Sequence, residues 1–344
     1  MRTGASRPAW VARLGLLLVA GIITVVVVRL IGRVDWAEVW AALKLLTWWH
    51  PLVLLVVLLV RQVLNALPLA LYIPGISPYQ ATLNDQAAIL MASLAPPPSD
   101  LALRLSIFGS WGVPTVKALA GTVMNTLTFY VVRFAAPIGG FVLLGLLGRA
   151  PGPRWLELLS IAISLAILVG VLLVVRSEQV ALAVGGRAGR AARRVRRSVD
   201  PEAWARSCAE FRSEIVVRFR RGFPQSLVAL VGMLAVDLTL LVLCLRFVGL
   251  DSSEVALAEI AVAYLFAYPF TIFPFSGIGV VDALVLAGLV EAAGSEVEAA
   301  GVAGLVVWRV FTVGGPVLLG LGALAVWRRG ASASAAASGP QLRP

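Results

Sequence analysis

The sequence predicts an all-α membrane protein, a polytopic helix bundle of about six spans with two opposed re-entrant hairpins. Hydrophobic residues make up 60% of the chain and mean hydropathy is +0.92, while charged residues make up 14%. A soluble domain has about 25% charged residues. Two apolar stretches are also interrupted near their middle by proline and glycine, and a broken helix survives at bilayer depth only where protein or water satisfies its backbone.

The spans are predicted from length, because a helix needs about 20 apolar residues to cross a bilayer. Six segments qualify: Leu14 to Ile31, Pro51 to Ile73, Val116 to Leu147, Leu156 to Val175, Ser226 to Leu250 and Ala300 to Trp327. The first follows several arginines, as in a signal peptide. It lacks a small-residue cleavage site, so we expect a retained span. Pro137 and Gly139-Gly140 could divide the third segment into two crossings.

The hairpins are predicted in the two interrupted stretches. Tyr79 to Trp111 breaks at Ala95-Pro96-Pro97-Pro98-Ser99-Asp100, and Val255 to Val290 breaks between Pro269 and Gly279. Each half is too short to cross comfortably, so each stretch should return to its own side. With six crossings the hairpins enter from opposite sides, one in each half of the chain. This is the arrangement of an inverted-repeat transporter.

Charge predicts orientation and partners. The net charge is +11, and much of it lies between Arg176 and Arg221. Arginine-rich loops stay cytoplasmic and attract anionic lipid headgroups. We therefore expect a cytoplasmic-membrane protein with both termini inside, and membrane lipids as its partners. Nucleic acid is not expected, because no basic fold interleaved with aromatic residues is present.

The chain is predicted to form a single transmembrane domain over residues 1–329. Its halves, 14–175 and 223–327, are joined by the basic loop 176–222, and the Ala- and Ser-rich residues 330–344 should be a disordered tail. Asp200-Pro201 should cap a helix within the basic loop. That helix and a second one, Trp36 to Trp48, are amphipathic, so each lies either on the membrane surface or against the bundle.

Ionisable residues at bilayer depth are costly, so each suggests a functional role. They are Arg61, Asp100, Arg104, Arg133, Asp237, Asp282 and Arg309. Asp100 and Arg104 are four residues apart and could form an ion pair, unless Asp100 caps the helix that begins there. Asp282 and Arg309 could form a bridge that is either structural or part of a substrate gate.

The remaining charged residues and the lone histidine are less specific. Arg61 and Arg133 suit phosphate through bidentate contacts, although both could instead extend to an interface. Asp237 stands among Leu and Val, where a structural role is favoured over proton coupling. His50, beside two tryptophans, is the only histidine. With no Gly-rich phosphate loop, Cys/His cluster or nucleophile elbow, we expect neither an enzyme nor a bound cofactor or metal.

The second hairpin carries a family resemblance. Gly277-Ile278-Gly279, then Asp282, then Arg309 in the next span match the pattern of the flippase-like transmembrane domain of lysylphosphatidylglycerol synthases. Phe275 and Ser276 stand where that family usually has Pro and Gly. In the first hairpin, Pro98, Asp100 and Arg104 resemble a family motif, but its glycine is missing and its spacing is one residue longer. The resemblance covers roughly Leu14 to Trp327.

The resemblance implies transfer of a lipid with a charged or sugar-bearing headgroup between leaflets. Arg61, Asp100, Arg104, Arg133, Gly277, Gly279, Asp282 and Arg309 are the residues expected at its site. Fused members of that family carry a soluble aminoacyltransferase domain, which we do not expect here, because only a short tail follows Trp327. Two alternatives remain: a non-catalytic membrane partner of an envelope lipid-modifying enzyme or glycosyltransferase, and an ion-coupled transporter of a small solute.

Overall fold

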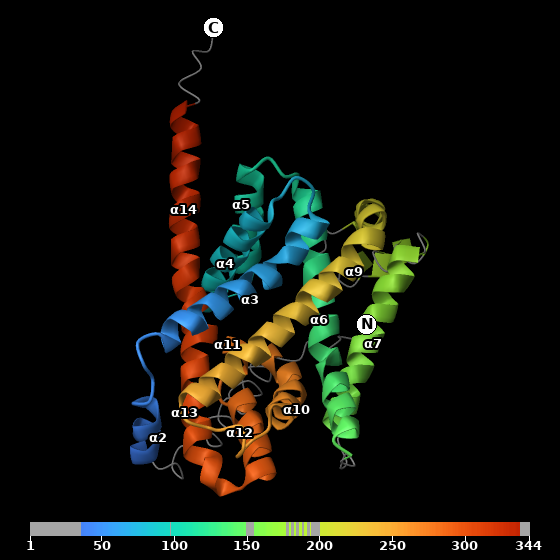
Figure 1. The fold of residues 1–344 in the computed structure, drawn as a ribbon. Coiled ribbons are helices and arrows are strands. Elements are labelled where there is room, and N and C mark those ends of the chain that lie inside the picture. The colour runs from blue at the N-terminus through green and yellow to red at the C-terminus, as the bar shows by residue number, and fades with distance from the viewer. Residues whose placement is uncertain are drawn as a thin grey trace, which may run out of the picture.

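The computed structural model describes residues 36–96, 98–148, 155–176 and 200–337, with a few positions between 179 and 193. Over these ranges the regular structure is entirely helical (Figure 1). The α-helices are α2 Trp36–Leu43, α3 His50–Tyr72, α4 Pro78–Leu94, α5 Ser99–Ser110, α6 Thr115–Leu146, α7 Trp155–Arg176, α9 Pro201–Phe247, α10 Leu257–Ala267, α11 Pro274–Gly277, α12 Val280–Ala293, α13 Glu298–Arg309 and α14 Gly315–Ala337. Short 3-10 turns cover Tyr268–Ile272 and Ser295–Val297, and a π-helical turn covers Val310–Gly314.

The membrane-spanning segments agree with the hydropathy of the sequence. Among the described residues, 5 helical segments are long and apolar enough to cross a bilayer: His50–Tyr72, Thr115–Leu146, Trp155–Leu173, Gly222–Phe247 and Ser295–Gly330. They correspond to five of the predicted spans. The remaining prediction, Leu14 to Ile31, lies outside the described residues. The fold is therefore a helical membrane bundle, as the composition indicates.

α6 is a single helix of 32 residues, with Pro137 inside it, so the third span is not divided. Its glycines serve packing. A Cβ on Gly140 would stand 2.9 Å from the Phe266 ring, and one on Gly139 would stand 3.1 Å from Leu265. The missing side chains let α10 approach α6 closely, and the surrounding helices support the proline in place.

Two predicted boundaries are wrong. Asp200 caps its helix by accepting from the Glu202 backbone N–H at 2.9 Å, as expected. However, α9 then runs unbroken through Pro224 to Phe247, so the surface helix and the next span are one element. α14 likewise continues to Ala337, where a disordered tail was expected from Gly330. Its alanines have high helix propensity, which favours continuing the helix.

Both interrupted stretches form helical hairpins. α4 packs against α5 in hairpin 1, and α10 packs against α12 in hairpin 2. Hairpin 1 has its open ends at the top of Figure 1 and hairpin 2 at the bottom, so their breaks approach the middle from opposite ends. The Trp327 Nε1 group donates to Ser110 Oγ at 2.9 Å, which fixes α14 beside the upper end of hairpin 1.

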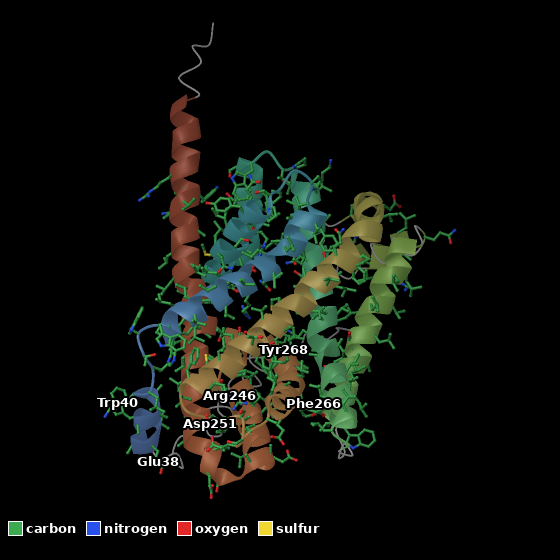
Figure 2. All side chains as sticks on the ribbon, in the orientation of Figure 1. Glu38, Trp40, Arg246, Asp251, Phe266 and Tyr268 are labelled. Carbon is green, nitrogen blue, oxygen red and sulfur yellow. The ribbon has the colours of Figure 1, made fainter. Side chains whose placement is uncertain are left out.

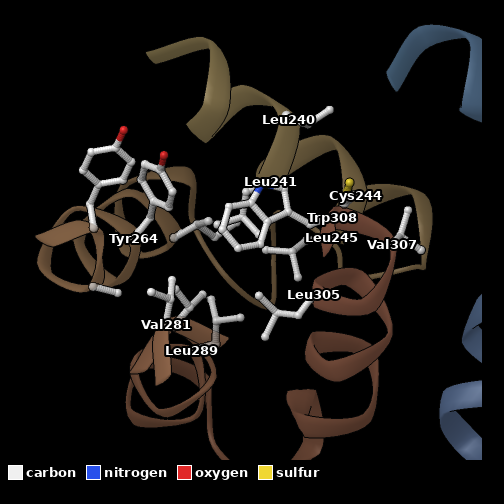
Figure 3. Packing of buried hydrophobic residues seen from close by; sticks show 14 of the residues in the cluster. Leu240, Leu241, Cys244, Leu245, Tyr264, Val281, Leu289, Leu305, Val307 and Trp308 are labelled. Carbon is white, nitrogen blue, oxygen red and sulfur yellow. The ribbon is translucent and has the colours of Figure 1, made fainter. Parts of the chain in front are cut away.

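The bundle is organised around α3 and α9, which pack along most of their lengths. His50 stacks on Phe247 at one end of the pair, and Tyr72 lies against Gly222 at the other, so the two helices are antiparallel. The largest buried cluster lies where α9 meets α10, α12 and α13, and it includes Tyr264 and Trp308 (Figure 3).

α2 is shorter than the predicted amphipathic helix and packs against α13. Val39 is buried in the main core cluster, whereas Trp40 is exposed at the edge of the bundle (Figure 2). α2 is therefore a packing helix with an exposed aromatic face. Of the two interpretations offered by the sequence, the contacts support packing against the bundle.

Candidate functional site

An ion pair joins the two central helices. Arg61 of α3 places Nε 2.9 Å from Asp237 Oδ1 of α9, at an angle that suits charge attraction better than a directed hydrogen bond. The Tyr264 hydroxyl of hairpin 2 donates to Asp237 Oδ2 at 2.8 Å. Asp237 is 2% exposed. The sequence alone did not predict these partners, because Arg61 and Tyr264 lie 176 and 27 residues away from Asp237 in the chain.

A chain of amides extends this contact to hairpin 1. Arg61 Nη1 donates to Gln62 Oε1 at 2.7 Å, and Gln62 Nε2 donates to Gln86 Oε1 of α4 at 2.9 Å. Both glutamines are buried. Hydrogen bonds therefore connect Tyr264 in hairpin 2 with Gln86 in hairpin 1 through Asp237, Arg61 and Gln62. We refer to these five residues as the polar relay.

The second ion pair lies inside hairpin 1. Arg104 of α5 donates to Asp85 Oδ1 of α4 at 2.8 Å and to Asn84 Oδ1 at 3.2 Å. Asn65 of α3 donates to the other oxygen of Asp85 at 2.8 Å. Asp85 is 3% exposed and is held by two donors from different helices. This cluster ties the two helices of the hairpin to each other and to α3.

The partner predicted for Arg104 is therefore wrong. Asp100 makes neither the ion pair with Arg104 nor the cap of its helix: the N-cap residue of α5 is Pro98, and no side chain caps it. Asp100 instead lies in the first turn of α5, where a negative charge is favourable beside unpaired backbone N–H groups. Asp85 takes the arginine because it faces Arg104 across the hairpin.

The third ion pair, between Asp282 and Arg309, is present as predicted. Arg309 Nε donates to Asp282 Oδ1 at 2.7 Å, and the Gly279 backbone N–H donates to Asp282 Oδ2 at 2.7 Å. Arg309 Nη1 also donates to the Ser276 carbonyl at 3.2 Å. Arg309 is thus attached to the break of hairpin 2 by a side chain and by the backbone. Its guanidinium also lies over the Trp308 ring, 4.4 Å from the ring centre.

The glycines of this break have a conformational role. Gly277 has φ +70° and Gly279 has φ +83°, values that other residues rarely adopt, and Ser276 between α10 and α12 is a non-glycine residue at φ +56°. A Cβ on Gly277 would lie 2.5 Å from the Phe270 carbonyl oxygen. The two glycines therefore allow the tight turn that brings Ser276 and Asp282 to Arg309.

The helix that carries Arg309 is widened immediately after it. The chain continues from α13 through the π-helical turn Val310–Gly314 into α14. Such turns are rare and are often found at functional sites. Gly315, the next residue, lies against Leu58 of α3, where a Cβ would be only 2.4 Å from the leucine side chain. The π-helical turn and the start of α14 therefore contact α3.

Arg133 of α6 has a different environment. Its guanidinium lies 4.5 Å from the centre of the Phe129 ring and 5.6 Å from that of Tyr130. Its Nε atom is buried and has no hydrogen-bond partner among the described residues. α6 also packs against the 3-10 turn Tyr268–Ile272, which begins the break in hairpin 2.

Sequence reasoning missed the polar residues of α4. Asn84, Asp85 and Gln86 are consecutive and all buried, and together they contact α3 and α5. The available signal was three polar residues in succession within an apolar stretch too short to be a loop. Gln62 was overlooked for a simpler reason, because it lies beside the more conspicuous Arg61.

Comparison with known families agrees with this geometry. A family model described as the lysylphosphatidylglycerol synthase TM region matches residues 13–320. The chain belongs to this family. The match includes both hairpins and all three ion pairs. A search of the curated proteins finds no match. Family membership therefore shows a membrane protein related to lipid handling, and it confirms the family that the sequence predicts.

Proposed function

We propose that this protein is a lipid translocase of the cell membrane, which moves a phospholipid or polyprenyl lipid with an anionic or sugar-bearing headgroup between leaflets. It acts without catalysing a covalent reaction. The observation that supports this most directly is a pair of helical hairpins that approach the middle of a membrane bundle from opposite ends, each holding an arginine in an ion pair. Broken elements of opposite orientation are typical of alternating access.

The arginines supply the chemistry of headgroup binding. A guanidinium offers planar donors that match the oxygens of a phosphate, and it stays charged in an apolar environment. Arg104 and Arg309 are paired with Asp85 and Asp282 in this structure, so they are neutral as pairs. A phosphate would compete with these carboxylates for the same donors. We propose that an arriving headgroup exchanges with the carboxylates as the hairpins move.

Charge supports a cytoplasmic location for both termini. The loops at the lower end of Figure 1 carry exposed acids, including Asp251, Glu254 and Glu296. At the opposite end α14 carries Arg328 and Arg329, and α9 begins after the arginine-rich segment. Basic segments favour the cytoplasmic side. On this orientation hairpin 1 enters from the cytoplasm and hairpin 2 from outside.

The proposal is tested by reconstituting the purified protein in liposomes with fluorescent lipids in both leaflets. An impermeant quencher then measures how fast labelled lipid crosses. We expect wild-type protein to accelerate crossing and Arg104→Gln and Arg309→Gln to slow it at least about tenfold, a loss of about 1.4 kcal/mol. Arg329→Gln, at an exposed arginine in the C-terminal half of α14, is the matched control and should behave as wild type.

The result that opposes translocation is equally clear. If folded wild-type protein moves neither phospholipid nor polyprenyl-phosphate sugar, or if both arginine variants move lipid at the wild-type rate, the hairpins do not form a transport site. Size-exclusion chromatography and thermal unfolding establish that each variant is folded before its transport rate is compared.

A second candidate is a docking partner for an envelope enzyme. It is favoured by the continuity of α9, which carries the arginine-rich segment after Pro201 directly into a span, and by the extension of α14 to Ala337 at the same end (Figure 1). At this end α14 extends past the other helices, and the first part of α9 lies beside α7. Deleting residues 187–197 should then abolish the function of the partner enzyme, while translocation by a flippase should survive the deletion.

A further inference from the structure

Among the described arginines near the middle of the spans, one has no carboxylate partner. Three interior arginines each have a carboxylate: Arg61 has Asp237, Arg104 has Asp85 and Arg309 has Asp282. Arg133 makes no ion pair with any described residue, and its contacts are with aromatic rings. The paired charges cancel, so within the part of the chain that the structure describes Arg133 is left as one positive charge without a counter-ion.

An unpaired cation at this depth is expensive. Arg133 lies within about one turn of the midpoint of α6, about 27 Å from its Thr115 end and about 20 Å from its Leu146 end. Burying a charge without a partner is costly even after relaxation, and contact with aromatic rings offsets only part of that cost. Such a residue persists in a membrane protein when it has a ligand.

Arg133 also faces a functional element. Phe129 and Ala136, one turn to either side of it, pack in the same core cluster as Tyr264 and Tyr268 of hairpin 2. Gly140, the next turn along, lies against Phe266. Figure 2 shows Tyr268 at mid-height in the bundle, close to α6. The unpaired guanidinium is therefore on the helix that contacts the break of hairpin 2, where the α-helix gives way to the 3-10 turn Tyr268–Ile272.

We propose that Arg133 binds the phosphodiester of a single membrane lipid beside the break of hairpin 2. This rests on the proposed function and specifies the ligand of that site. The buried Nε without a partner supplies a donor, and the rest of the guanidinium fork supplies others in the same plane. The aromatic rings of Phe129 and Tyr130 hold the fork in place from one side.

The charge of the site selects one class of lipid. One phosphodiester carries one negative charge, which neutralises Arg133 in the state seen here, in which the three ion pairs are closed. A diphosphate linkage carries two negative charges and leaves one unbalanced in a medium where unpaired charge is costly. The site therefore suits phospholipids and polyprenyl-monophosphate sugars, and it disfavours polyprenyl-diphosphate sugars.

Lipid retention tests this directly. Native mass spectrometry of the full-length protein measures how much phosphatidylglycerol or polyprenyl diphosphate remains bound as the lipid is titrated. We expect Arg133→Gln to weaken retention of phosphatidylglycerol at least about tenfold, which corresponds to about 1.4 kcal/mol, while Arg329→Gln has no effect. Polyprenyl diphosphate should bind more weakly than phosphatidylglycerol to wild type and should respond little to the substitution.

Two further measurements test the same site: retention by Arg133→Lys and competition by inorganic phosphate. Arg133→Lys keeps the charge but loses the planar fork, so its retention should fall between that of wild type and Arg133→Gln, at unchanged thermal stability. It decides the matter if the glutamine variant does not fold. Inorganic phosphate should fail to displace the lipid, because the site is reached through the membrane. Displacement by inorganic phosphate, or equal retention by wild type and a folded Arg133 variant, overturns the proposal.

The liposome assay described above, carried out on Arg133→Gln, distinguishes lipid binding by Arg133 from lipid translocation. Retention that depends on Arg133 in a protein that moves no lipid supports the binding site and removes the translocase. Lipid movement that is undiminished in Arg133→Gln removes the binding site and leaves the translocase standing. Loss of thermal stability without any loss of retention shows that Arg133 only braces α6, and this also overturns the proposal.

Discussion

The ion pair between Arg61 and Asp237 allows a quantitative prediction. Substituting Asp237→Asn preserves the size of the side chain, and its amide oxygen can still accept from the Tyr264 hydroxyl. The change removes the negative charge that compensates Arg61. Because the side chains of Arg61 and Asp237 are only 18% and 3% exposed, solvent cannot replace the lost partner. The variant therefore leaves a buried cation unpaired at the centre of the α3–α9 pair.

The size of the effect follows from the cost of a buried unpaired charge. Removing one partner of a buried ion pair typically costs about 3–5 kcal/mol. Removing both charges avoids that penalty, so the double variant Arg61→Gln, Asp237→Asn should lose only about 1–2 kcal/mol, comparable with the loss of hydrogen bonds alone. The double-mutant cycle should therefore show a coupling free energy of at least about 2 kcal/mol.

The assay is reversible unfolding of the purified protein in mixed micelles by increasing SDS, followed by far-UV circular dichroism. Both single variants should unfold at lower SDS, and combining them should restore part of the stability. Strict additivity would refute the reasoning, since it would mean that the two charges do not compensate each other. Asp251→Asn, at an exposed loop position, is the control and should leave stability within about 0.5 kcal/mol of wild type.

Further predictions concern three glycines and the ion pair between Asp282 and Arg309. Gly277→Ala should destabilise the protein by about 1–3 kcal/mol, because both the backbone conformation and the available space exclude a side chain, and thermal unfolding measures this loss. Gly320→Ala should weaken the packing of α14 on α4, because a Cβ would stand 2.6 Å from both the Gln86 carbonyl oxygen and the Leu90 Cβ. Gly322→Ala has nothing within 4 Å of its Cβ and should be neutral in the same assay. Asp282→Asn should keep the hydrogen bond that stabilises the start of α12 yet lose the ion pair, so it should impair lipid movement more than stability. Asp282→Ala should reduce both, and equal stability of the two variants would contradict this division.

Much of the fold follows from local features of the sequence. Apolar length predicts the crossing helices, because a helix in lipid must satisfy its own backbone. Gly277 and Gly279 predict the break, because a tight turn requires residues that adopt positive φ. Asp282 predicts the ion pair with Arg309, because a charge at bilayer depth requires a partner of opposite charge. The cap at Asp200 follows from the same kind of local rule. These features depend on a few neighbouring residues, so the chain alone reveals them.

The partners of Arg61 and Arg104 depend on how distant helices pack. Arg104 and Asp100 are four residues apart, and helix periodicity favours their pairing, but Asp85 faces Arg104 across hairpin 1 and is more deeply buried. Asp237 appears isolated in sequence because Arg61 lies 176 residues away. Periodicity along one helix says nothing about the rotation of another. Both errors therefore arise from tertiary contacts that no local rule contains.

The polar relay limits how the hairpins can move. Tyr264 in hairpin 2 and Gln86 in hairpin 1 are linked through Asp237, Arg61 and Gln62, and all five side chains lie largely out of solvent. Withdrawing hairpin 2 alone would remove the Tyr264 hydroxyl from Asp237 Oδ2 and leave that buried oxygen only the longer 3.4 Å hydrogen bond from Arg61 Nη2.

Withdrawing hairpin 1 alone would likewise leave the Gln62 amide without its acceptor, and each unsatisfied polar group costs about 1–3 kcal/mol. Both hairpins could instead shift together against the α3–α9 pair, with a headgroup or water taking over the vacated hydrogen bonds. Such a movement avoids the free-energy cost of leaving these polar groups unsatisfied. We therefore expect the two ends of the site to open in a coupled order. A cross-link that fixes hairpin 2 to α9, made after Tyr268→Cys and Met233→Cys, whose native side chains are in contact, should then slow opening at hairpin 1 as well as at hairpin 2, measured by cysteine accessibility.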